Sequence, residues 1–160
     1  MQGDRGGLSN LPNMTEQQVL TKLTTLCARG EHCQQEMLDK MRRWEIDKAT
    51  QARVMEYLIK EKFIDEERYT RCFVEEKIKF NGWGRKKVEQ ALYMKRIPSS
   101  IYNPILDEVD EKNYEEILRP LIEAKRKTIT GKSEYEIRGK LIRFALSRGF
   151  EMDEILRILD

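Results

Sequence analysis

An internal repeat is the feature that most constrains how this chain can fold. Five apolar positions, separated by four, five, eight and one residues, occur three times at offsets of 51 and 53 residues. The three sets are Met37, Met41, Ile46, Val54 and Met55; Val88, Leu92, Ile97, Ile105 and Leu106; and Leu141, Ala145, Phe150, Ile158 and Leu159. Such spacing is typical of apolar helical stripes, and the period is too long for tetratricopeptide or ankyrin repeats. The pattern predicts tandem units that bury their stripes partly against one another.

Start and stop signals divide each unit into three helices. Residues that favour a helix N-terminus precede the stripes at Thr15, Asp47, Asp65, Asp110 and Ser133, and Gln18 and Glu136 complete two capping boxes. Pro120 lies inside the helix opened by Asp110, so we expect a kink or a break there because proline lacks the backbone donor. We predict an all-α fold of three tandem three-helix repeats in an elongated array that could curve. The expected boundaries are a flexible leader at 1–14 and repeats at 15–62, 63–109 and 110–160.

Composition supports thin helical layers. Of the 160 residues, 39% are hydrophobic and 36% are charged, which leaves too little apolar surface for a sheet buried on both faces. No apolar stretch is long enough to span a membrane, and the N-terminus lacks the apolar core of a secretory signal. The three cysteines are too few and too irregular for a disulfide framework. We therefore expect a cytoplasmic protein, a monomer with reduced thiols.

The sequence carries no pattern of a catalytic site. It has neither a Gly-Lys-Ser/Thr phosphate loop nor a Gly-x-Ser-x-Gly elbow. Cys27, His32 and Cys33 lie close together, but a structural zinc site needs four ligands and His32 is the single histidine. We expect no enzyme activity, no cofactor and no bound metal; tight binding of an added metal or nucleotide would contradict this.

Charge is segregated along the chain. Residues 77–96 hold seven Lys and Arg against one Glu, residues 125–148 hold eight against two, and residues 106–118 hold six Asp and Glu against one Lys. The candidate partner-binding residues are Lys77, Lys79, Arg85, Lys86, Lys87, Lys95, Arg96, Arg138, Lys140, Arg143 and Arg148. They could follow a phosphate backbone or an acidic protein groove, or they could form a solvated face balanced by the acidic stretch.

Trp83, between two glycines, has two interpretations as well. An exposed indole would anchor a partner or stack on a base, whereas a buried one would wedge between helices. Burial is the commoner state of tryptophan, which favours the wedge.

The middle of the chain carries a distinctive series of motifs. They are Phe63-Ile64-Asp65-Glu66-Glu67-Arg68-Tyr69, then Phe73, then Gly82-Trp83-Gly84-Arg85-Lys86-Lys87-Val88, and finally Leu92 and Lys95-Arg96-Ile97. This series resembles the RecX family of recombination regulators. The resemblance extends more weakly over residues 15–160. The small residue usual before the final isoleucine of this pattern is replaced by Glu45 and Arg96, so looser turns are expected at these two positions.

The resemblance implies a regulator without catalysis of its own. Members of this family are three-repeat helical proteins that bind the RecA recombinase, lie in the groove of its filament on single-stranded DNA, and suppress ATP hydrolysis and strand exchange. The partners implied are the RecA filament and single-stranded DNA, touched directly or through the filament, with no membrane. The alternative is a free-standing nucleic-acid-binding protein whose glycine turns form helix-turn-helix elements.

Overall fold

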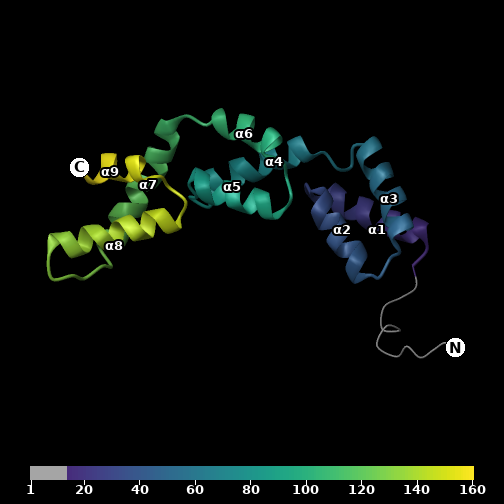
Figure 1. Ribbon diagram of the computed structural model, residues 1–160, viewed down its shortest axis with the longest axis horizontal. Coiled ribbons are helices and arrows are strands. Elements are labelled where there is room, and N and C mark those ends of the chain that lie inside the picture. The colour runs from purple at the N-terminus through teal and green to yellow at the C-terminus, as the bar shows by residue number, and fades with distance from the viewer. Residues whose placement is uncertain (1–13) are drawn as a thin grey trace, which may run out of the picture. The chain divides into compact units, whose positions relative to one another are not determined.

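The chain is helical throughout the part that the structure describes. The computed structural model describes residues 14–160, in which nine α-helices and one π-helical turn follow one another without a strand (Figure 1). This confirms the all-α repeat fold. The chain divides into two compact units between Tyr69 and Thr70. The predicted leader falls on residues 1–13 outside the described range, apart from Met14.

The first unit packs α1 (Glu16–Arg29), α2 (Gln34–Arg43) and α3 (Lys48–Lys60) around one apolar core. The capping box predicted at Thr15 is present, and Gln18 returns a hydrogen bond to the Thr15 amide. Helices α1 and α2 both pack on α3. The fully buried core residues are Val19, Leu23, Met37, Met41, Val54 and Leu58.

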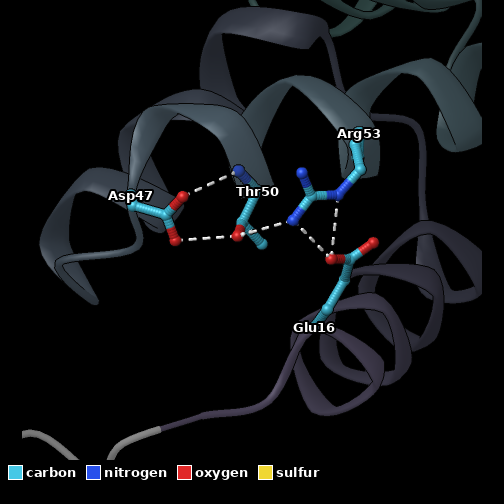
Figure 2. Close-up of polar contacts among 4 residues, drawn as sticks. All are labelled: Glu16, Asp47, Thr50 and Arg53. Atoms are coloured by element: carbon cyan, nitrogen blue, oxygen red, sulfur yellow. Dashed lines mark hydrogen bonds and ion pairs between the residues drawn. The ribbon is translucent and has the colours of Figure 1, made fainter.

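A polar network holds the start of α3 to the start of α1 (Figure 2). Asp47 caps α3 by accepting hydrogen bonds from the Thr50 amide and hydroxyl, at 3.1 and 2.7 Å. Arg53 donates to the Thr50 hydroxyl and, through Nε and a terminal nitrogen, to Glu16 Oε1 at 3.1 and 2.9 Å. The hydrogen bonds from Thr50 lower the pKa of Asp47, because they favour the charged carboxylate.

The acidic-basic motif at 65–69 holds the beginning of α4 (Glu66–Glu75) within the first unit. Asp65 caps this helix, and the Glu66 carboxylate accepts the Gln34 amide of α2 at 3.0 Å. Arg68 pairs with Glu31 at 2.6 Å. The residues that carry the family resemblance at this position therefore make structural contacts.

The second unit continues α4 into the π-helical turn η2 (Glu76–Phe80) and then contains five further helices. These are α5 (Arg85–Met94), α6 (Ser99–Asp107), α7 (Glu111–Arg126), α8 (Glu134–Ser147) and α9 (Met152–Leu159). Helix α5 packs on η2 and α6, while α7 packs on η2, α8 and α9. Helix α7 thus packs on its own partners, α8 and α9, and also on η2.

The repeated stripes end in the same type of turn three times. Glu45, Arg96 and Gly149 have φ of 58°, 59° and 94°. The next residue donates its amide to the carbonyl five positions back, in the pairs Ile46 to Met41, Ile97 to Leu92 and Phe150 to Ala145. This is the Schellman arrangement, which usually has glycine at the left-handed position. The prediction of looser turns at Glu45 and Arg96 is wrong, because the hydrogen bonds and the burial of the flanking stripe hold the same geometry without glycine.

Helix α7 runs from Glu111 to Arg126 through Pro120, so the predicted break does not occur. Leu118 and Ile122, on either side of the proline, are buried, and their packing maintains the helix across the missing hydrogen bond.

The capping box predicted at the start of α8 is only half formed. Ser133 accepts the Glu136 amide, but the Glu136 carboxylate accepts the amide of Lys132 instead of Ser133.

Candidate partner-binding surface

Trp83 lies in the turn between η2 and α5. Gly82, at φ 70°, supplies the left-handed residue that the turn requires, and the Trp83 amide donates to the Lys77 carbonyl at 3.0 Å. The indole is half-buried and meets the Phe73 ring edge to face, with centroids 6.4 Å apart. Trp83 therefore packs between elements, as the wedge interpretation expects, while part of its surface stays open.

Two lysines approach the same indole. The Nζ atoms of Lys77 and Lys87 lie 5.2 and 4.6 Å from the Trp83 ring centroid, and Lys77 lies 5.3 Å from that of Phe73. Ammonium groups at this distance are attracted by the electron-rich ring face. The aromatic pair thus holds two cations of the first basic stretch at one place.

The start of α5 is joined by its backbone to the turn between α8 and α9. The amide of Gly84 donates to the Arg148 carbonyl at 2.8 Å, and the amide of Lys86 donates to the Gly149 carbonyl at 3.0 Å. These bonds satisfy amides that a helix N-terminus leaves free. They also bring the basic first turn of α5 beside Arg148, which belongs to the other basic stretch.

A second group of cations surrounds Phe144 on α8. The Lys125 ammonium and the Arg148 guanidinium lie 5.3 and 5.2 Å from its ring centroid. Phe144 is four residues before Arg148, so both side chains lie on one helix face. Sequence reasoning missed Phe144 and Lys125 as site residues, although the spacing of an aromatic and a basic residue on α8 was a usable signal. We call seven residues the basic surface: Lys77, Trp83 and Lys87 of the first group, Lys125, Phe144 and Arg148 of the second, and the exposed Lys86 in the first turn of α5.

Several predicted site residues are instead held by carboxylates. Arg85 pairs with Glu89 at 2.9 Å and with Asp107 at 2.7 Å, and its side chain is mostly buried. The other pairs are Lys79 with Glu75, Arg138 with Asp160, and Lys140 with Glu136. These four cations help to hold the fold together or balance a neighbouring charge.

The remaining predicted residues separate by position. Lys86, Arg96 and Arg143 are exposed and make no ion pair with any residue of 14–160. Lys95 is half-buried at the end of α5. The acidic stretch is also partly neutralised, since Glu108 and Glu115 pair with arginines.

Family models match most of the second unit. The second three-helix domain of RecX matches residues 65–103, and the third three-helix domain matches residues 113–159. Together the two matches cover more than half of the chain.

Within the described residues, no helix has the length and apolar character needed to cross a membrane.

Curated relatives agree with these matches. The "Regulatory protein RecX" of Clostridium tetani is 31% identical over 129 residues, which are 79% of this chain and 59% of the relative. That of Vibrio campbellii is 27% identical over 130 residues, or 81% of this chain and 82% of the relative. The chain therefore spans about three fifths of the length of the clostridial relative.

Solved structures share the fold. The crystal structure of RecX from Lactobacillus salivarius superposes with a TM-score of 0.79 at 20% identity, covering 90% of this chain and 94% of that one. A crystal structure of regulatory protein RecX gives a TM-score of 0.84 at 15% identity, covering 91% of this chain and 73% of that one. With the family-model matches over residues 65–103 and 113–159, the chain belongs to the RecX family.

Proposed function

We propose that this protein binds the RecA filament on single-stranded DNA and lowers its ATP hydrolysis and strand exchange. Membership of a family of regulatory proteins supports a binding function. The observation that carries the proposal is the backbone junction between Gly84 and Arg148, which places the first turn of α5, with Lys86 and Lys87, beside the turn that holds Arg148.

The chemistry of this surface suits a filament that carries a nucleic acid strand. Lys86, Lys87 and Arg148 make no ion pair with any residue of 14–160, so their charge remains available. Cations attract a phosphate backbone or an acidic groove at long range and release counterions on contact, which requires no exact register. Aromatic rings beside the cations add contact area and hold their positions.

The same geometry disfavours a helix-turn-helix reader of duplex DNA. Such a reader presents the N-terminal residues of its recognition helix to base edges in the major groove. Here the first turn of α5 is bonded to the α8–α9 turn, and Arg85 is held by Glu89 and Asp107. A sequence-specific footprint on naked duplex DNA would support that alternative.

The test is an assay of single-strand-DNA-dependent ATP hydrolysis by RecA of the same organism. The intact protein is expected to lower the rate at substoichiometric ratios. The triple variant Lys86→Gln, Lys87→Gln and Arg148→Gln is expected to need at least tenfold more protein for the same inhibition, with a weaker dependence on salt.

A matched control separates this site from general charge. Lys48→Gln with Lys60→Gln removes two exposed lysines at the ends of α3 and should leave inhibition unchanged. Surface substitutions of this kind should change stability by no more than about 0.5 kcal/mol each. Equal inhibition by the triple variant and the intact protein would show that the basic surface is not the contact.

A further inference from the structure

A hollow of about 520 Å³ lies at the other end of α5, about 15 Å along the helix from the basic surface. Its lining comes from the last turn of α5 and the beginning of α6, and comprises Tyr93, Met94, Arg96, Ile97, Pro98, Ser99 and Tyr102. Ile97 forms a buried floor, at 2% exposure. The hollow therefore offers an apolar base inside a rim of larger side chains.

The rim is unusually open for its residue types. Tyr93 and Met94 are 70% and 71% exposed, although burial of either side chain from water is favourable. Tyrosine, methionine and arginine are the side chains enriched where one protein surface meets another. A concave shape with exposed Tyr93 and Met94 suits insertion of a partner's side chain better than a flat stacking surface for bases.

Charge limits what can enter. Among the described residues that line the hollow, Arg96 carries a charge and none is acidic. The exposed side of α5 leading to it carries Lys86 and Gln90 and no carboxylate. The positive rim would attract a carboxylate placed next to an apolar side chain.

Arg96 occupies its position at a cost in stability. Its φ of 59° is the left-handed conformation that glycine adopts at the equivalent turn, Gly149. A side chain with Cβ is disfavoured in that conformation. Glu45 and Lys62 have the same conformation, so the case for the hollow rests on its shape, its exposed rim and its charge.

We infer that this hollow binds an acidic, apolar segment of the filament protein itself, in which an apolar side chain enters between Tyr93 and Tyr102 and a carboxylate meets Arg96. The inference rests on the proposed function. It adds a direct protein contact to the electrostatic contact of the basic surface.

The experiment measures the affinity of the full chain for RecA filaments assembled on single-stranded DNA, at two salt concentrations. The variants are Tyr93→Ala with Met94→Ala, and Arg96→Glu, each checked for unchanged helicity by circular dichroism. Tyr135→Ala is the matched control, because Tyr135 is 87% exposed and lies elsewhere, on α8. We expect the double variant to lose at least tenfold in affinity with the same salt dependence, and Arg96→Glu to lose about tenfold.

Three results would overturn the inference. If both hollow variants bind filaments within twofold of the intact protein while the Lys86, Lys87 and Arg148 variant is weakened, the hollow is not a contact and the proposed function stands. If the hollow variants lose affinity equally for naked single-stranded DNA, the occupant is the nucleic acid strand. If the intact protein does not bind filaments, the proposed function fails and the inference fails with it.

Discussion

Gly84 and Gly149 lie in direct backbone contact. A Cβ atom on Gly84 would come within 2.5 Å of the carbonyl carbon and oxygen of Gly149, and one on Gly149 would come within 2.5 Å of the Lys87 amide nitrogen. The two glycines around Trp83 are therefore required for different structural reasons. Gly82 supplies a left-handed turn, and Gly84 allows the α8–α9 turn to reach the start of α5.

Adding a methyl group at this contact should therefore destabilise the second unit. We expect Gly149→Ala to lower the free energy of unfolding by about 2–4 kcal/mol, from overpacking and from its positive φ. Urea denaturation measures this change. Gly139→Ala is the control, because Gly139 lies inside α8 and a Cβ there would make only an ordinary contact, 3.6 Å from the end of the Arg143 side chain, and alanine should stabilise the helix by about 0.5–1 kcal/mol. Equal stability of Gly149→Ala and the parent protein would show that the contact is looser than described.

Replacing the left-handed residues with glycine should separate stability from binding. Glu45→Gly and Arg96→Gly should each stabilise the protein by up to about 1 kcal/mol, because glycine adopts positive φ without a Cβ clash. Thermal denaturation gives the two shifts. Arg96→Gly should also weaken filament binding, whereas Glu45→Gly should not. Loss of stability in both variants would mean that side-chain contacts at these turns outweigh the backbone strain.

Tyr114 on α7 offers a simple stabilising substitution. Its hydroxyl is buried and has no hydrogen-bond partner among the described residues, and burial raises its pKa to about 12. Tyr114→Phe removes this unpaired group and should stabilise the protein by about 1 kcal/mol.

Tyr69→Phe is the opposite case. The Tyr69 side chain is buried and hydrogen-bonded to those of Cys33 and Glu36. Removing its hydroxyl breaks these hydrogen bonds and should destabilise the protein by about 1 kcal/mol. Denaturant midpoints of the two variants should move in opposite directions; movement in the same direction would contradict this account.

Glu154 at the start of α9 predicts a pH dependence of stability. Burial raises the pKa of this carboxyl above 4.5, so the folded state holds its proton at higher pH than the unfolded state does. Stability should then fall as pH rises from about 4.5 through the folded pKa. Glu154→Gln keeps an oxygen to accept the Glu151 amide and should reduce this fall, as measured by melting temperature between pH 4 and 7.

Asp47 provides a contrast of opposite sign. Its pKa is lowered by the hydrogen bonds from Thr50, so the stability that it contributes is present above pH 3.8 and is lost as pH falls below that value. Asp47→Asn should reduce the acid-induced loss and leave the slope between pH 4.5 and 7 unchanged. Matching pH profiles for the Asp47 and Glu154 variants would show that neither carboxyl controls the transition.

Local sequence determined the helices of this protein. The helix starts at Thr15, Asp47 and Asp110 follow from side chains that cap amides within three residues. The repeated apolar spacing also determined the three Schellman turns. Each of their hydrogen bonds joins two apolar residues of the repeat that lie five apart in the chain. Interactions of this range can be read from spacing alone.

Tertiary structure decided which cations are available. Arg85 and Lys86 are adjacent in a basic run, yet Arg85 is held by Asp107 from α6 while Lys86 remains unpaired within residues 14–160. The spacing of Arg85 and Glu89 within α5 allows one of its ion pairs to be read from the sequence, but the pair with Asp107 could not be, because that carboxylate comes from another helix. The π-helical turn at Glu76–Phe80 and the continuity of α7 through Pro120 also depend on packing between helices.

The basic surface depends on both local sequence and tertiary structure. Sequence alone supplied its lysines and arginines, the glycines around Trp83 and the repeat that places them in equivalent helices. Only the fold brought Gly84 against Gly149, and with it Lys87 beside Arg148. The physical reason is that helix formation is governed by neighbours within one or two turns, whereas contact between distant residues depends on how whole helices pack.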